Sequence, residues 1–185
     1  SQPGDSAVAF EFPLKTEGTR DFHTDRFQWN NFQAYDMSGR LFMQEDQLDI
    51  NQVEFGAFGG RTYLQANLKD AGAGDNLLFD SRVYLEHIDI HRVFETFRNF
   101  GQDYITARNL QGMLTGEMKL QVDLDKYLQI NKPSLFTLCD IEIEDGQLIA
   151  FEPLIKMANF VSLSELQQVD FSRLSNEITI KDQTV

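Results

Sequence analysis

The strongest constraint on the fold is the segment 109–124, NLQGMLTGEMKLQVDL, in which apolar and polar residues alternate. A period of two places successive residues on opposite faces of a β-strand. One predicted face carries Leu114, Gly116, Met118, Leu120, Val122 and Leu124, and the other carries Thr115, Glu117, Lys119, Gln121 and Asp123. A strand with one continuous apolar face must cover that face with another sheet, a helix or a ligand.

The beginning of this strand has a counterpart earlier in the chain. Residues 34–41 (AYDMSGRL) and 107–114 (ARNLQGML) share the pattern A-x-[DN]-[ML]-x-G-x-L. A repeated turn–glycine–strand unit predicts a sheet built from similar hairpins. It also predicts two related sub-units, at about residues 8–100 and 101–185, within a single β-rich domain or fragment that spans residues 1–185.

Most of the remaining segments also have the periodicity of strands. Alternation predicts strands at residues 8–14, 37–43, 48–57, 63–68 and 77–88, with a bulge after Ile50, where the apolar phase slips by one residue. Residues 135–149 predict a hairpin that turns at Glu144-Asp145-Gly146.

Two segments have the periodicity of a helix instead. Ile90, Val93, Phe94 and Phe97 follow the spacing i, i+3, i+4 and i+7, with Asp89 as the predicted N-cap and Gly101 as the predicted stop. A second short helix is predicted to start at Pro153. The predicted class is therefore mainly β, a curved antiparallel sheet of amphipathic strands with two short helices.

The charge balance argues against two classes of partner. Sixteen basic and 29 acidic residues give a net charge of −13, which argues against binding to nucleic acid and against docking on anionic membrane surfaces. No apolar run is long enough for a transmembrane helix, and no signal peptide is visible. The chain stops directly after the apparent strand at residues 178–180, which predicts that it is a segment of a longer protein.

The residues with catalytic or metal-binding chemistry form no convincing constellation. In H-I-D-I-H, His87, Asp89 and His91 would share one face of a strand and offer metal ligands, but a helix that begins at Asp89 breaks that face. The single cysteine, Cys139, excludes an internal disulfide and is interpreted as a small core residue. The paired carboxylates Glu142 and Glu144 are interpreted as the solvated face of a strand. We therefore predict no catalytic, cofactor-binding or metal-binding residues, and no cofactor.

The order of the predicted segments resembles the C-terminal region of the AsmA family of envelope proteins, from about residue 30 to the end. The resemblance is carried by Met37-Ser38-Gly39-Arg40-Leu41, Ala57-Phe58-Gly59-Gly60-Arg61, the Phe-rich helix, Asn109-Leu110-Gln111-Gly112, Ile141-Glu142-Ile143-Glu144-Asp145-Gly146-Gln147-Leu148 and Val169-Asp170-Phe171-Ser172-Arg173-Leu174. The resemblance implies the periplasmic region of a protein anchored in the inner membrane of a Gram-negative envelope. It also implies a β-rich trough for lipid transport in outer-membrane biogenesis, without catalytic residues.

On this basis, the expected function is to hold or pass phospholipid or another envelope lipid along an apolar sheet face. The predicted lipid-facing residues are Leu64, Ala66, Leu68, Leu114, Met118, Leu120, Val122 and Leu124. The alternative is a non-catalytic scaffolding module, in which this face is a closed core and the charged face or sheet edges bind protein partners of the envelope. An enzyme on a β scaffold is a third alternative. The lipid, the direction of transfer and the oligomeric state are not set by the sequence.

Overall fold

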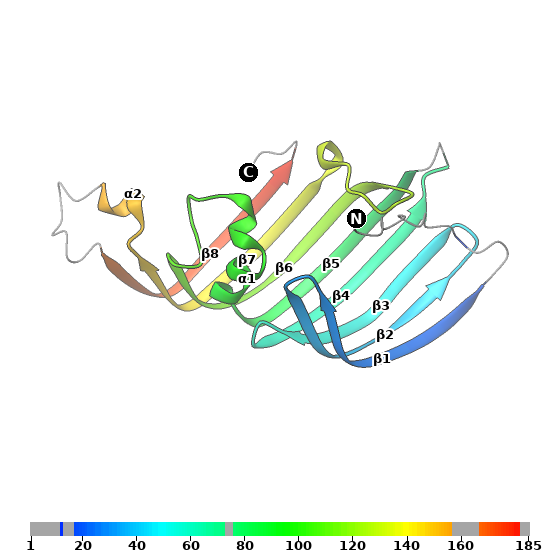
Figure 1. Ribbon diagram of the computed structural model, residues 1–185, viewed down its shortest axis with the longest axis horizontal. Helices are drawn as coiled ribbons and strands as arrows, with labels where there is room; N and C mark the ends of the chain where they lie inside the picture. Colours follow the sequence, from blue (N-terminus) through cyan, green and yellow to red (C-terminus); the bar gives the residue numbers. More distant parts are fainter. Residues whose placement is uncertain (1–11, 13–16, 73–75, 157–166, 182–185) are drawn as a thin grey trace, which may run out of the picture.

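The computed structural model describes residues 12, 17–72, 76–156 and 167–181, and they form one antiparallel sheet (Figure 1). Its strands are β1 (Gly18–Trp29), β2 (Phe32–Met43), β3 (Gln47–Ala57), β4 (Gly60–Asp70), β5 (Asn76–Asp89), β6 (Leu110–Asp125), β7 (Phe136–Ile149) and β8 (Gln168–Lys181). The prediction of a mainly β protein with a curved antiparallel sheet and two short helices is confirmed.

The strands pair in the order in which they follow one another along the chain, β1 to β8. The sheet is continuous across residue 100, where β5 pairs with β6 from Asn76–Asp125 to Asp89–Met113. Because the strands alternate in direction, their connections lie at two ends of the sheet. One end carries the helix α1 (Ile90–Thr96), and the other carries the 3-10 helix η2 (Lys132–Ser134). We call these the α1 end and the η2 end.

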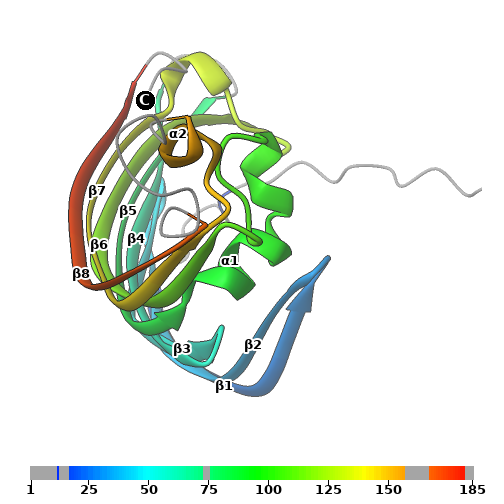
Figure 2. The ribbon, with the colours of Figure 1, turned by 90° about the vertical axis from the view of Figure 1, so that its left-hand side faces the viewer.

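The sheet is strongly curved, and α1 lies inside the curve (Figure 2). Strands β2, β3, β5 and β7 each contain a β-bulge, at which two residues oppose one residue of the neighbouring strand. The bulges are at Asp36, Gln52, His87 and Asp145, which have φ angles of 50°, 53°, 51° and 48°. A bulge bends its strand and increases the local twist, so each of these bulges contributes to the curvature. The predicted bulge after Ile50 is confirmed.

Asp89, the last residue of β5, and Ile90, the first residue of α1, determine where the helix begins. The side chain of Asp89 accepts a hydrogen bond from the backbone N–H of Arg92, at 3.3 Å, as an N-cap does. The next residue, Ile90, is buried with Ile88, Leu110, Leu114 and Ile143, and Val93 and Phe94 pack against this cluster. The predicted start of the helix is confirmed. Its end is earlier than predicted: α1 stops at Thr96, and the predicted stop, Gly101, is the last residue of the 3-10 turn η1 (Arg98–Gly101).

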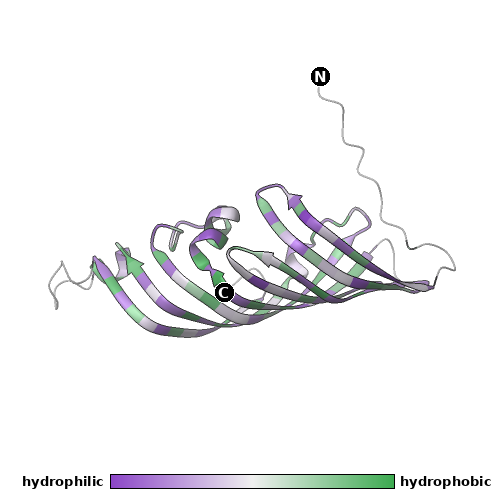
Figure 3. Ribbon diagram, turned by 90° about the horizontal axis from the view of Figure 1, so that it is seen from below, coloured by the Kyte–Doolittle hydropathy of each residue, from purple (hydrophilic) through white to green (hydrophobic). Residues whose placement is uncertain are grey.

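Alternation along the strands separates the two faces of the sheet, as the bands of hydrophobic and hydrophilic residues in Figure 3 show. We call the concave face, on which α1 packs, the inner face, and the convex face the outer face. A second buried cluster on the inner face consists of Ala34, Val53, Phe55 and Ala57, surrounded by Phe22, Ile50 and Leu64 among others. The core of the protein is therefore one side of a single sheet.

The predicted hairpin at residues 135–149 is wrong. Residues 136–149 form one strand, β7, which pairs with β6 on one side and with β8 on the other. The left-handed conformation of Asp145 forms a bulge within that strand, where the sequence suggested a turn. The predicted second helix is confirmed over α2 (Glu152–Ile155). Its predicted continuation beyond residue 156, and the predicted strand at residues 8–14 apart from Phe12, lie outside the described residues.

The two copies of the repeated motif have a common structural feature. Each places its glycine beneath a branched side chain of the next strand: a Cβ on Gly39 would lie 2.7 Å from Cγ2 of Val53, and a Cβ on Gly112 would lie 2.6 Å from Cγ2 of Ile143. The first copy lies inside β2, and the second spans the entry to β6. The motif therefore marks a close approach between two strands of the inner face in both halves of the sheet.

Candidate functional site: the inner apolar face

The main feature of the inner face is a row of side chains that crosses all eight strands at the same level. Cross-strand pairing and the contact of Gly39 with Val53 align its members. From β1 to β8 they are Phe22, Gly39, Val53, Leu64, Val83, Met118, Cys139 and Ile178. This row, which we call the central row, contains no charged side chain. Eight strands spaced by about 4.8 Å give it a length of roughly 34 Å.

Two further rows run beside the central row on the side of the η2 end. One contains Leu41, Ile50, Ala66, Ser81, Leu120, Thr137 and Ile180, and the other contains Met43, Leu48, Leu68, Phe79 and Val122. From β2 to β8 the polar members of these rows are hydroxyls, and Thr137 is buried, whereas the β1 residue opposite Leu41 is Arg20. Together, the three rows define what we call the inner apolar face.

The structure places all eight predicted lipid-facing residues on the inner face. They come from β4 and β6, which are not neighbours, because β5 lies between them. Ala66, Leu68, Leu114 and Val122 are buried, whereas Leu64, Met118, Leu120 and Leu124 are partly exposed. Leu114 lies under α1 in the cluster around Ile88, so it belongs to the closed part of the face.

Sequence reasoning missed the contributions of the other strands to this face. Phe79 and Val83 of β5 lie between the predicted residues of β4 and β6. Their alternation is visible in the sequence of 77–85, but Ser81 interrupts the apolar pattern. Ile178 and Ile180 of β8 extend the face to one edge of the sheet.

The outer face has the opposite chemistry and is covered by charged pairs. Arg40 hydrogen bonds to Asp21 at 2.7 Å, which lowers the pKa of that carboxyl group below its ordinary value. Arg82 pairs with Glu117 at 3.0 Å. Because these groups are exposed, each pair contributes little to stability. Their arrangement keeps the outer face solvated and leaves the inner face as the apolar surface.

Other residues with reactive side chains have structural partners. Arg173 pairs with Glu142 at 3.3 Å and with Glu144 at 3.4 Å. In H-I-D-I-H, Asp89 caps α1, and Nδ1 of His91 lies 2.6 Å from the carbonyl oxygen of Ala107. Among the described residues, no group of three or more His, Cys, Asp or Glu side chains is arranged to hold a metal ion.

Cys139 is half-buried in the central row, between Met118 and Ile178. Burial raises the pKa of its thiol, because desolvation disfavours the thiolate. The folded state therefore prefers the protonated thiol, and this contribution to stability is lost as the pH rises above about 8.5, the pKa of a free thiol.

We expect alkylation of Cys139 in the folded protein at neutral pH to be about tenfold slower than in urea, because only the thiolate reacts. The alkylation rate should also increase with pH in both states, and this increase should occur at a higher pH in the folded protein than in urea. Both are measured by the mass shift with iodoacetamide over time. Equal rates in the folded and unfolded protein would contradict the burial of this thiol.

The α1 end carries a cluster of aromatic rings. Phe97 stacks on Phe32 and on Phe100, with ring centroids 6.5 and 5.6 Å apart, and Phe27 contacts Phe32 edge-on. Trp29, beside Phe32 across the β1–β2 turn, is 66% exposed. We call Phe27, Trp29, Phe32, Phe97 and Phe100 the aromatic tip. The spacing of Ile90, Val93, Phe94 and Phe97 predicts one apolar face of a helix, and the structure shows that Phe94 packs in the core whereas Phe97 is exposed.

The backbone beside the aromatic tip is strained. Arg98, Asn99 and Phe100 are consecutive non-glycine residues with φ angles of 52°, 53° and 55°. The left-handed conformation costs about 1–2 kcal/mol for each such residue. The side chain of Asn99 holds the turn in place by accepting a hydrogen bond from the backbone N–H of Ala107, at 3.0 Å.

Comparison with known proteins identifies no relative. No protein-family model matches the chain, and neither a curated protein nor a solved structure matches it. Within the described residues, no helix is both long and apolar enough to cross a membrane.

Proposed function

We propose that the protein holds lipid on its inner apolar face, or passes lipid along it, as a periplasmic module of an AsmA-like envelope protein in outer-membrane biogenesis. The observation that carries this proposal is the central row, an uncharged strip of side chains across all eight strands. The motif order that resembles the AsmA family supports the compartment and the parent protein.

The dimensions and chemistry of the inner apolar face suit an acyl chain. Its length of roughly 34 Å exceeds the ~15 Å that one leaflet contributes to the bilayer core. Burying an acyl chain is favourable by about 0.8 kcal/mol per methylene. Contacts with Leu64, Met118 and Leu120, which are partly exposed, offer no hydrogen-bond specificity. The face therefore suits lipids that share acyl chains and differ in their headgroups.

A second candidate function, as a scaffold that binds protein partners, is favoured by the sheet edges. β1 and β8 each pair with only one described strand, so one side of each has main-chain N–H and C=O groups without a described strand partner. Most of their residues are exposed. Such edges are templates for an added strand from another protein.

The substitution Leu120→Asp distinguishes the two candidates. If the inner apolar face holds lipid, the variant should fold, and the amount of phospholipid bound to it should fall at least tenfold. The reason is that a charge in hydrocarbon costs about 2.5 kcal/mol or more. The measurement is native mass spectrometry of protein purified without detergent, with extraction of the lipid that co-purifies. Folding is followed by circular dichroism.

The matched control is Leu138→Asp. Leu138 is also partly exposed, but it lies on the outer face opposite Lys119, which would pair with the new carboxylate. This variant should keep both the fold and the lipid. If Leu120→Asp unfolds the protein, the face is a closed core and the scaffold function is favoured. If both variants retain the same lipid, the lipid binds elsewhere.

A further inference from the structure

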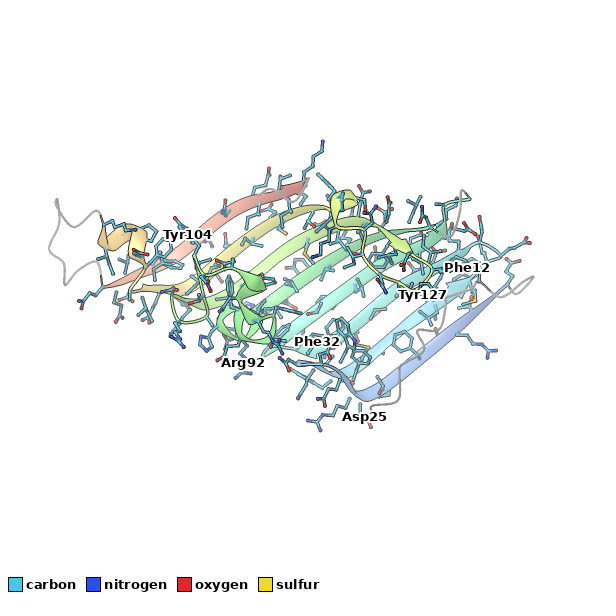
Figure 4. The ribbon with its side chains drawn as sticks, turned by 45° about the horizontal axis from the view of Figure 1, so that its top comes forward. Phe12, Asp25, Phe32, Arg92, Tyr104 and Tyr127 are labelled. Atoms are coloured by element: carbon cyan, nitrogen blue, oxygen red, sulfur yellow. The ribbon has the colours of Figure 1, made fainter. Side chains whose placement is uncertain are left out.

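The aromatic tip combines four phenylalanine rings in serial contact with Trp29, which lies opposite Phe32, and most of these side chains are exposed. The exposed fractions are 42% for Phe27, 66% for Trp29, 42% for Phe97 and 60% for Phe100. Isolated exposed apolar residues are ordinary, but a contiguous cluster marks an interaction site. The cluster joins two segments that are distant in sequence, the β1–β2 turn and the end of α1. In Figure 4, Phe32 and Arg92 mark this end of the sheet, and Tyr127 marks the other.

The polar groups around the aromatic tip suit a phosphate. A shallow depression of about 580 Å³ lies between the turn and α1, lined by Trp29, Asn30, Asn31, Phe32, Thr96, Phe97 and Arg98. Arg98 has no ion-pair partner within the part of the chain that the structure describes. Its guanidinium and the amides of Asn30 and Asn31 are hydrogen-bond donors beside an indole ring.

We propose that the aromatic tip docks on the surface of a phospholipid bilayer. Trp29 enters the interfacial region, where Trp is enriched, and the exposed phenylalanine rings reach the boundary between headgroups and acyl chains. Arg98 pairs with a lipid phosphate, which a guanidinium binds in bidentate geometry. The strained turn at residues 98–100 has a role in this arrangement, because it presents Phe100 and Arg98 at the end of the sheet.

The net charge argues against docking of the molecule as a whole on anionic lipid, and the distribution of charge explains why only this end approaches a bilayer. The chain has a net charge of −13, and carboxylates such as Asp21, Glu117 and Glu142 cover the outer face. The outer face is therefore repelled by anionic lipid. At the tip, the carboxylate of Glu95 lies 3.3 Å from His91, and that of Asp89 lies 3.2 Å from Arg92, which leaves Arg98 to pair with phosphate. Docking by the aromatic tip does not depend on whether the inner apolar face holds lipid.

Trp29 is the single tryptophan of the chain, so its fluorescence reports on the tip without labelling. On addition of phosphatidylcholine–phosphatidylglycerol vesicles, we expect a blue shift of the Trp29 emission and quenching by lipids with brominated chains. Phe100→Asn should weaken vesicle affinity about tenfold, since it removes one buried ring. Asparagine tolerates the positive φ of residue 100, so the fold is retained. Arg98→Gln should weaken affinity roughly fivefold on these vesicles and less on phosphatidylcholine alone.

The control variant is Ile130→Ser. Ile130 is 59% exposed, nearly the same as Phe100, but it follows β6 near the η2 end. Vesicle affinity should be unchanged in this variant. The proposal is overturned if vesicles leave the Trp29 emission unchanged, or if Ile130→Ser weakens binding as much as Phe100→Asn does. Vesicle binding is measured separately from co-purifying lipid. A result against docking by the aromatic tip is therefore distinguishable from a result against lipid binding on the inner apolar face.

Discussion

Replacing Ile88 with aspartate is expected to unfold the protein. Ile88 is fully buried beneath α1, in contact with the cluster of Ile90, Leu110, Leu114 and Ile143. A carboxylate there has lost its water without gaining a described cationic partner, and we expect a cost above about 4 kcal/mol. This is a large part of the roughly 5–15 kcal/mol that stabilises a typical domain. The measurement is urea unfolding followed by circular dichroism.

Two controls separate charge from position. Ile88→Val keeps the site apolar and should cost about 0.5–1.5 kcal/mol. His87→Asp introduces the same carboxylate one residue earlier, where the side chain is exposed and the φ angle of 51° suits aspartate. It should change the free energy of unfolding by no more than about 0.5 kcal/mol. An Ile88→Asp variant with an unchanged urea midpoint would show that α1 does not close over this part of the sheet.

The second large effect is expected for Gly60→Ala, at the start of β4. A Cβ on Gly60 would lie 2.2 Å from the carbonyl oxygen of Glu86 and 2.3 Å from that of His87. These atoms belong to the backbone of β5 and cannot move aside as a side chain does. The β4–β5 pairing must therefore separate beside the α1 entry, at a cost of about 3 kcal/mol.

The comparison variant for this prediction is Gly18→Ala. At Gly18, a Cβ would meet no described atom within 4 Å. The substitution should stabilise the protein by roughly 0.5 kcal/mol, because alanine has less backbone freedom to lose than glycine. Both variants are compared by their urea midpoints. Equal midpoints for Gly60→Ala and the unsubstituted chain would contradict the close approach of β4 and β5.

Local patterns predicted the strands and helix start well, because each is set by a few neighbouring residues. The alternation in 114–124 gave β6 its two faces, and the change of period at Asp89 located α1. The Asp145-Gly146 pair was misread as a turn. This pair suits a hairpin and a bulge equally well, since both use a left-handed residue. Only the pairing of β7 with both neighbours distinguishes the two.

The candidate site could be predicted only one strand at a time. Alternation placed Leu64 and Leu120 on apolar faces, and the structure shows that these faces coincide. The position of β5 between β4 and β6 follows from strand pairing. Pairing joins residues that are far apart in the sequence, so a local pattern does not show it. The aromatic tip was missed for a similar reason. Phe97 has the spacing of a core residue, but it faces the β1–β2 turn, where Trp29 and Phe32 lie.

The order of pairing also makes the sheet a modular array. Each strand bonds only to the strands before and after it in the chain, as each unit of a solenoid contacts only its neighbours. A hairpin added to or removed from either edge would therefore change the length of the apolar strip and leave the other pairings intact. In such an architecture, gene duplication of a single hairpin is enough to lengthen the molecule, without redesign of its core.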